Sequence, residues 1–324
     1  MLTIDFDEKF ISADNHVLET YRTCEEKYRL MIRDQWTPDS SAPALAFGIA
    51  MHAARAAYKK AFLQQDTLVK YKLTHEQSPI IDYAINIGLL TWSKEMPDDM
   101  KTEVKVNDKR SCLNFERLAR GYFAKYGNPD EFTPLHVEVP GNRFLGTTPK
   151  GWRMDYVYTI DEVVQHQGKI YPLEFKTGSG FYPPDSFFFE KFHNMASVTG
   201  YLWAVEQEFG VRCEGAMIHA MWVHAEPKTT SKSKYTLPDY FKMDYTYRDD
   251  AQIEEWKENT LRTADDIVQS IAEDRWKRND GVACSMYNGC SMKKICQSTP
   301  AIRQRLLEID YRKRPWNPWA RMEE

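Results

Sequence analysis

The spacing of hydrophobic positions changes along this chain, and the change separates predicted helices from predicted strands. In the first part, apolar residues recur at the spacing of amphipathic helices. The predicted helices cover residues 21–32, 47–63, 80–94 and 112–126. The pattern then shifts to shorter apolar runs bounded by turn residues, which is typical of strands.

The strand-rich part contains a predicted hairpin. Strands are expected around Glu138 and Leu145, and then in the runs GWRMDYVY and YPLEFKTG, which the turn-like run QHQGK connects. A helix is expected over 187–209, strands over 213–224 and 240–247, and a helix over 251–275. This order predicts an α/β fold with a mixed central sheet flanked by helices. We expect one domain over 1–324, with a helical part over 1–130, a sheet core over 131–250 and a cysteine-bearing end over 251–324.

Composition supports a globular protein without a strong overall charge. The 324 residues are 42% hydrophobic and 13% aromatic, so the chain can bury a substantial core. The 43 basic and 47 acidic residues give a net charge of −4, so a nucleic-acid partner would have to meet a local basic patch. No apolar run reaches the length of a membrane span, and the N-terminus MLTIDFDEKF does not resemble a signal peptide. We therefore expect a cytoplasmic protein, or one in the host cytoplasm if a phage encodes it.

The predicted hairpin carries a candidate catalytic group. Asp155 lies on its first strand, and Glu174 and Lys176 lie on its second, where strand alternation places both on one face. Carboxylate oxygens suit Mg²⁺, which polarises a phosphoryl oxygen and activates water. Lys176 would orient that water or offset transition-state charge. The pattern predicts a phosphodiesterase site.

Other groups besides Asp155 and Glu174 are candidate metal ligands. The backbone carbonyl of Phe175 lies between the acid and the lysine. His52 follows Gly48 by four residues on a predicted helix, and its imidazole would favour Mn²⁺ at a mixed nitrogen and oxygen site. Glu138 is an additional candidate acid. Acid-x-Lys alone is a common chance match, so the order of these elements carries the interpretation.

Four cysteines form a candidate metal site. Cys284, Cys290 and Cys296 are evenly spaced near the C-terminal end, and Cys24 lies near the N-terminal end. Four thiolates would select an iron-sulfur cluster or Zn²⁺ over hard cations, and the spacing alone leaves both open, with free thiols as the simpler alternative. Cys112 and Cys213 are expected to be packed thiols.

These motifs resemble those of the RecB-like branch of the PD-(D/E)xK nuclease superfamily. The family pattern has a helical GxxxH, a G-x-x-D strand, a (D/E)-x-K-(T/S)-G strand and a helix with Q-x-x-x-Y. Gly48 and His52 match the first motif, and Glu174, Lys176, Thr177 and Gly178 match the third. Asp155 follows Gly151 by one residue more than the pattern. Tyr201 is present, but Ser197 stands where glutamine is expected.

The resemblance implies a restriction-endonuclease-like core, a Mg²⁺ or Mn²⁺ site and a site role for Tyr201. Iron-sulfur members, AddB-like and CRISPR-adaptation exonuclease-like, place one cysteine in a Y-x-x-C-x-x-x-Y/F context and three near the C-terminus. Cys24 between Tyr21 and Tyr28 fits that context, whereas the usual C-x2-C start of the triplet is absent. The resemblance thus favours a [4Fe-4S] cluster, with zinc as the alternative.

The segment after the acid-x-Lys strand is dense in aromatic residues. Phe181, Tyr182 and Phe187 to Phe189 would either stack on unpaired bases or pack in the core. With the resemblance, this segment favours an exonuclease acting on single-stranded DNA ends in recombination, repair or phage DNA metabolism, beside a helicase or recombinase partner. The chain has no Walker A motif of its own. The alternatives are a non-catalytic DNA-binding or scaffold subunit and a zinc-stapled structure-specific endonuclease.

Overall fold

The chain folds into two compact units. The computed structural model describes residues 3–39, 43–63, 79–95, 109–226, 234–285 and 289–319. One unit, here the terminal unit, contains Met1–Asp39, Pro140–Thr159 and Asp249–Glu324, and the other, the central unit, contains Ser40–Val139 and Ile160–Arg248. The predicted mixed α/β class is confirmed. The division into 1–130, 131–250 and 251–324 stays a prediction. None of the described helices is both long and apolar enough to cross a lipid bilayer.

The central unit is built on a mixed sheet. Its strands are the second part of β5 (Arg153–His166), β6 (Lys169–Gly178), β7 (Ala216–Trp222) and β8 (Phe241–Thr246). Strand β6 is antiparallel to β5 and parallel to β7, and β8 is antiparallel to β7. The long strand β4 (Thr133–Thr147), like β5, contributes residues to both units.

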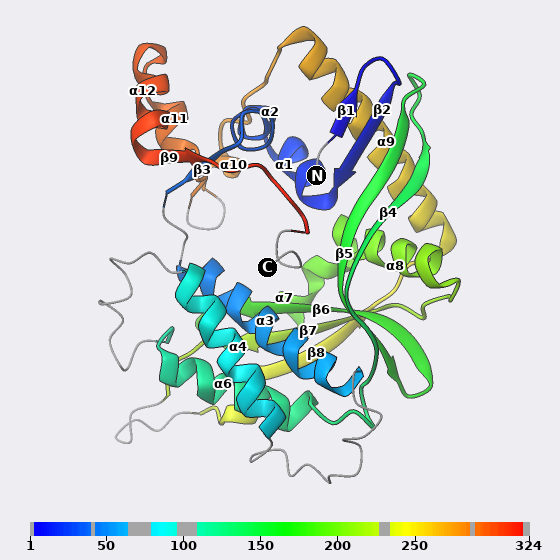
Figure 1. Cartoon of the computed structure of the whole chain (residues 1–324), viewed down its shortest axis with the longest axis vertical. Helices are drawn as coiled ribbons and strands as arrows, with labels where there is room; N and C mark the ends of the chain where they lie inside the picture. Colours follow the sequence, from blue (N-terminus) through cyan, green and yellow to red (C-terminus); the bar gives the residue numbers. More distant parts are fainter. Residues whose placement is uncertain are drawn as a thin grey trace. The chain divides into compact units, whose positions relative to one another are not determined.

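Three helices cover one face of this sheet (Figure 1). They are α3 (Pro43–Leu63), α4 (Pro79–Glu95) and α6 (Cys112–Tyr126), close to the ranges that the hydrophobic spacing predicts. Their apolar faces meet the sheet in one core, where Phe47, Phe115 and Phe175 are at most 1% exposed. Phe175 therefore points toward the helices, and α3 passes directly over β6.

A tight turn joins β5 to β6. Its two residues, Gln167 and Gly168, have φ angles of 51° and 78°, and His166 pairs with Lys169 across it. Two-residue hairpin turns of this hand need left-handed backbone at both positions, which glycine adopts without strain. The turn thus fixes which residues of β5 and β6 lie opposite each other.

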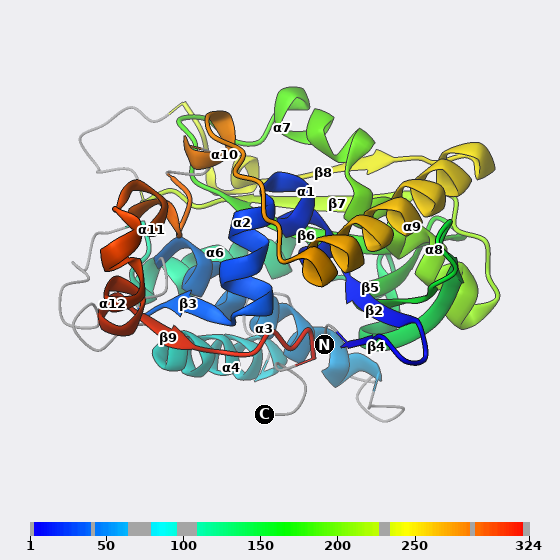
Figure 2. The ribbon, with the colours of Figure 1, turned by 90° about the horizontal axis from the view of Figure 1, so that it is seen from above.

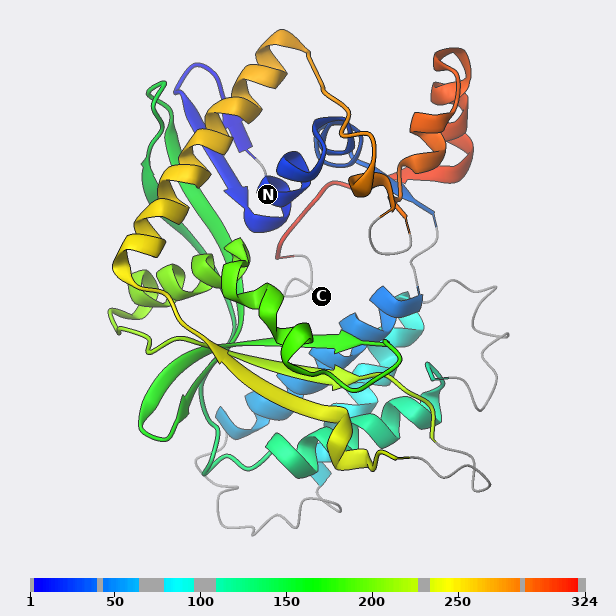
Figure 3. The same cartoon turned by 180° about the vertical axis from the view of Figure 1, so that it is seen from behind.

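The helix predicted over 187–209 is interrupted. The structure has α7 (Ser186–Glu190), a 3-10 turn (Lys191–Asn194) and α8 (Ala196–Phe209) (Figure 3). Met195, in extended backbone, separates the 3-10 turn from α8. Gly210 ends α8 in the left-handed conformation, as the sequence predicts. A short 3-10 turn, Leu237–Tyr240, precedes β8.

The terminal unit combines short strands and helices. In chain order these are β1 (Thr3–Asp5), β2 (Phe10–Asp14), α1 (Asn15–Thr23), α2 (Glu25–Tyr28), a π-helical turn (Arg29–Arg33), β3 (Trp36–Pro38), α9 (Asp250–Glu273), α10 (Val282–Ser285), α11 (Lys293–Gln297), α12 (Pro300–Asp310) and β9 (Tyr311–Lys313). Strand β2 pairs in parallel with the start of β5, and β3 pairs with β9 beside α11 and α12 (Figure 2). The Tyr21 hydroxyl bonds Ser270 at 2.8 Å, which ties α1 to α9.

Candidate active site

The hairpin of the central unit sets two acids opposite each other. Glu162 of β5 pairs with Leu173 of β6, in the register that the turn fixes. Continuing that register by one residue aligns Asp161 with Glu174. Asp161 is not among the site residues that the sequence predicts. The signal for it lies in the two-residue turn, from which the opposing positions can be counted.

His52 lies against Asp161. The Nδ1 atom of His52, on α3, is 3.2 Å from Oδ2 of Asp161, and both side chains are about a quarter exposed. Burial would raise the pKa of Asp161, but the neighbouring His52 and the charges of Lys176 and Arg55 outweigh burial and lower it. Asp161 is therefore an ionised carboxylate beside an imidazole.

Glu174 and Lys176 form an ion pair on β6. Glu174 is 6% exposed at its side chain, whereas Lys176 is 41% exposed, so the lysine covers the acid and reaches solvent. Phe175, between them, is buried toward α3. The predicted alternation along this strand is thus present, with the acid and the lysine together and the ring on the other face.

Gly48 places α3 close to the end of β6. A Cβ at Gly48 would lie 3.4 Å from the Thr177 hydroxyl oxygen. The glycine of GxxxH and the threonine that follows Lys176 are therefore neighbours, although more than a hundred residues separate them. This approach positions His52, one helical turn later, over the same region of the hairpin.

A buried ion pair lies beneath these side chains. Arg55 donates to Glu162 at 2.9 Å, and Lys59 lies 3.3 Å from the other oxygen of the same carboxylate. All three side chains are at most 5% exposed. Arg55 follows His52 by three residues, and Glu162 follows Asp161 directly. The pair thus ties the backbone that carries His52 to the backbone that carries Asp161.

Asp155 belongs to the terminal unit. It pairs along the sheet with Ser12 of β2, and its carboxylate accepts from Arg153 at 3.1 Å. Gly151, four residues earlier, has a φ of 83° in a turn closed by its own N–H to the Thr148 carbonyl at 2.9 Å. The structure gives this glycine a local role as a turn residue. That Asp155 joins Glu174 at a metal stays a prediction.

Two other predicted site residues, Glu138 and Tyr201, lie on other elements of the fold. Glu138 forms an ion pair with Lys60, eight residues beyond His52 on α3. Tyr201 lies on α8 and is partly buried. Their roles as a metal ligand and a site residue stay predictions.

In the terminal unit, one small pocket is lined by Cys24, Cys284, Cys290 and Cys296. The pocket is also lined by Lys27, Arg278 and Lys293 and by one acid, Asp280, so its charged lining is positive on balance. Positive surroundings favour thiolates and anionic clusters. The structure therefore brings the remote Cys24 together with the three cysteines near the other end of the chain.

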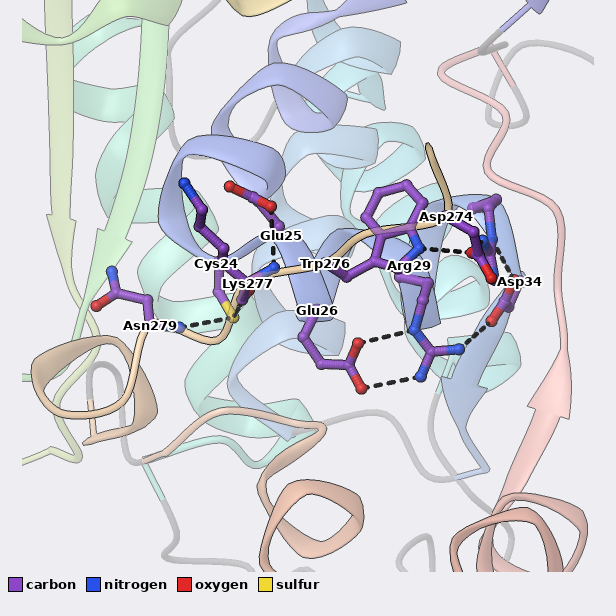
Figure 4. Close-up of polar contacts among 10 residues, drawn as sticks. Cys24, Glu25, Glu26, Arg29, Asp34, Asp274, Trp276, Lys277 and Asn279 are labelled. Atoms are coloured by element: carbon purple, nitrogen blue, oxygen red, sulfur yellow. Dashed lines mark hydrogen bonds and ion pairs between the residues drawn. The ribbon is translucent and has the colours of Figure 1, made fainter. Parts of the chain in front are cut away.

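The backbone around Cys24 is held by polar contacts (Figure 4). Cys24 separates α1 from α2, and its sulfur accepts from the Asn279 N–H at 3.5 Å. The Glu25 carboxylate accepts from the Lys277 N–H at 2.9 Å, and the Glu26 N–H donates to the Lys277 carbonyl at 3.0 Å. The segment before Cys284 is thereby fixed against the segment of Cys24.

The cysteines differ in their burial and in the pKa of their thiols. Burial raises the pKa of Cys296, whereas Arg278 lowers it by less. Cys213 is buried, as the sequence predicts, and burial raises its pKa to about 12. Cys112 is exposed, so the prediction that it is a packed thiol is wrong. Among the described residues, no three His, Cys, Asp or Glu side chains already surround one point at metal-binding distance.

A comparison with protein families identifies one family. A family model of the PD-(D/E)XK nuclease superfamily matches residues 16–297. A solved candidate exonuclease from Eubacterium rectale is 13% identical, with 88% of this chain and 90% of that chain covered and a TM-score of 0.40. The solved protein SSO0001 is 15% identical, with 67% and 79% covered and a TM-score of 0.31. No curated protein matches the chain.

Proposed function

The chain belongs to the PD-(D/E)XK nuclease superfamily, and from that premise we propose that it is a metal-dependent deoxyribonuclease that hydrolyses phosphodiester bonds from DNA ends. The observation that carries this proposal is the group formed by His52 and Asp161 beside the hairpin partner Glu174 and its neighbour Lys176. These side chains come from α3, β5 and β6, and the charge of Lys176 acts on both carboxylates.

The donor chemistry suits a hard divalent cation. Two carboxylates and the Phe175 carbonyl are oxygen donors that Mg²⁺ accepts, and the His52 imidazole adds the preference of Mn²⁺. We propose Asp161 rather than Asp155 as the acid of this strand, because Asp161 is the one that contacts His52. When bound, the cation would polarise a phosphoryl oxygen and lower the pKa of a water molecule.

The remaining side chains would position and neutralise the substrate. Lys176 pairs with Glu174, so its ammonium is held where it can orient an attacking water or offset charge on the pentavalent phosphorus. Lys176 neutralises the carboxylate of Glu174, which limits repulsion between Asp161 and Glu174. Tyr201 on α8 is proposed as a further substrate-positioning group.

We also propose that the cysteine pocket holds a [4Fe-4S] cluster, with zinc as the alternative. Four thiols, with three cationic side chains against one acid around the same pocket, fit an anionic thiolate cluster. The Asn279 N–H directed at the Cys24 sulfur is the type of hydrogen bond that tunes such clusters. The role of the cluster would be structural, because it would join the segment between α1 and α2 to α10 and α11.

We further propose a substrate, a pathway and a partner for this activity. Single-stranded ends are the favoured substrate, in recombination, repair or phage DNA metabolism, with a helicase or recombinase as partner. The aromatic residues that follow β6, from Phe181 to Phe189, support the preference for single strands.

Cleavage of end-labelled and circular DNA with Mg²⁺ or Mn²⁺ tests the proposed activity. The wild-type chain should shorten linear DNA from its ends. Asp161→Asn and Glu174→Gln should each lower the rate by at least about 100-fold, because each removes a charge that the site needs. Asp130→Asn is the matched control, because Asp130 is exposed on a loop of the same unit.

The same assay separates the two candidate acids. If Asp155→Asn abolishes cleavage while Asp161→Asn does not, the assignment of Asp161 is wrong. If no DNA is cut with any divalent metal, the non-catalytic scaffold interpretation replaces the nuclease. If circular DNA is cut as readily as linear DNA, the chain is an endonuclease.

A further inference from the structure

An open pocket lies beside the end of the strand that carries Glu174 and Lys176. It has a volume of about 690 Å³ and is lined by residues from Gly178 to Asn194, together with Trp222 of β7. Gly178, the last residue of β6, is part of its wall and follows Lys176 by two positions. All of these residues belong to the central unit.

The aromatic residues of this segment divide into a core set and an exposed set. Phe189 and Phe192 are buried at 6% and 0% exposure. Phe181, Tyr182 and Phe187 are 95%, 71% and 80% exposed, and all three line the pocket. Core packing therefore accounts for the first set and not for the second.

The pocket wall is held in place at both ends. The Trp222 indole N–H donates to the Gly180 carbonyl at 2.8 Å. Asp185 caps α7 by accepting from the Phe188 N–H at 3.0 Å, and two prolines restrict the backbone before it. The exposed rings thus extend from an ordered segment, which lowers the entropy cost of binding a planar partner.

The charge at the pocket connects it to the active site. The Lys191 ammonium lies 4.1 Å from the Phe188 ring centre. Burial lowers the pKa of Lys191, and the charge of Lys176 lowers it further. Asp185 and Glu190 also line the pocket and would repel phosphate from its interior. Its chemistry therefore suits an uncharged aromatic group, with a phosphate at the lysine rim.

We propose that this pocket binds unpaired nucleobases of the substrate strand, stacked on Phe181, Tyr182 and Phe187, while Lys191 contacts the adjoining phosphate. The proposal rests on the proposed nuclease function and specifies its substrate. Bases in a duplex are already stacked and do not present their faces to protein rings, so the pocket selects single-stranded DNA. Stacking is tolerant of sequence, and the site would read strandedness and not base identity.

Binding measurements without cleavage test the pocket. The Glu174→Gln chain, compared with the same chain carrying Phe181→Ala, Tyr182→Ala and Phe187→Ala, is titrated by fluorescence polarisation at fixed salt. The probes are a labelled single strand of about 12 nucleotides, within the usual site sizes of single-strand binders, and a hairpin duplex. Tyr83→Ala is the control, because Tyr83 is 54% exposed on α4 away from these lining residues.

The expected result is a selective loss. The triple variant should bind the single strand at least about tenfold more weakly, because each base-ring stack contributes about 1–3 kcal/mol. Duplex binding, and both affinities of the Tyr83→Ala control, should stay unchanged. An unchanged single-strand affinity, or an equal loss for duplex, would overturn the proposal.

A second probe keeps the pocket separate from the catalytic proposal. A single strand with 2-aminopurine near its end loses fluorescence when that base stacks, so the signal should fall on binding and recover in the triple variant. A chain that stacks the base but cuts no DNA would reject the nuclease function and retain the pocket. A chain that cuts DNA without quenching the base would reject the pocket alone.

Discussion

The Arg55 guanidinium lies over the ring of Phe175, with 4.4 Å between the guanidinium carbon and the ring centre. Phe175 is the residue between Glu174 and Lys176, so this contact supports the strand that carries both. Arg55 also binds Glu162, next to Asp161, and follows His52 on α3. Arg55 therefore lies on α3 and contacts β5 through Glu162 and β6 through Phe175. These are the three elements that carry the site residues.

Arg55→Met should lower both stability and activity. Removing one partner of a buried ion pair costs up to about 3–5 kcal/mol, and here Glu162 stays buried with Lys59 as a partner. The free energy of unfolding, from urea titration, should fall by that order. Arg120→Met is the matched control, because Arg120 forms exposed ion pairs with Asp82 and Glu116, and its loss should cost at most about 1 kcal/mol.

Arg55→Lys distinguishes positioning from stability. Lysine keeps the charge but has no planar guanidinium to stack on Phe175 while binding Glu162. We expect the maximal cleavage rate to fall by about tenfold at saturating metal, while half of the stability lost in Arg55→Met is regained. Full activity in a folded Arg55→Lys chain would show that Arg55 only stabilises the fold.

Cys24→Ala should remove the proposed cluster. The chain, purified without oxygen, is expected to contain iron and sulfide and to absorb visible light. Cys24→Ala should lose both, because it removes one of four thiol ligands around the pocket. Cys112→Ala, which changes an exposed thiol elsewhere, should keep them. Zinc in a colourless wild-type protein would reject the iron-sulfur cluster and retain the four-cysteine site.

The sequence predicts the elements of the fold better than their ends. Hydrophobic spacing predicts α3, α4, α6 and α9, because each has a continuous apolar face. It does not predict β1 and β2, because these strands are short and one is mostly exposed. The break at Met195 is also missed, because no proline or glycine marks it and the apolar pattern continues through it.

The candidate site shows why residue type alone is not enough. Glu174 and Lys176 can be found from local spacing, because strand alternation fixes their common face. The acid opposite them depends on the register, which the Gln167–Gly168 turn decides. In an extended strand, the six residues from Asp155 to Asp161 span about 20 Å. Choosing between these acids therefore needs the turn geometry.

His219 is buried beside the Arg55 network. Arg55 donates to the Tyr122 hydroxyl oxygen at 3.0 Å, and that hydroxyl lies 2.7 Å from Nδ1 of His219. Arginine can only donate, so the Tyr122 proton is directed to His219, whose Nδ1 accepts. Among the described residues, Nε2 of His219 has no hydrogen-bond partner. A neutral imidazole fits this arrangement and a protonated one does not.

Acid should therefore destabilise the central unit through His219. Burial, followed by the charges of Arg55 and Lys59, lowers its pKa well below the usual value. The other ionisable groups around it are Tyr122, Lys125 and Tyr126 of α6 and His166 of β5. The unfolded chain binds a proton near pH 6.5 that the folded chain does not, so this stability is present above about pH 6.5 and lost below it.

The expected loss between about pH 7.5 and pH 5.5 is about 1.4 kcal/mol, the linkage energy of one proton over one pH unit. His219→Gln keeps a side-chain acceptor for Tyr122 but does not titrate. Between the same two pH values, its free energy of unfolding should therefore fall by about 1.4 kcal/mol less than that of the wild-type chain. Carboxylates titrate in both chains, and their effect cancels in the difference. If both chains lose the same stability, the folded protein accommodates a protonated His219, and the direction of the Tyr122 hydrogen bond is reversed.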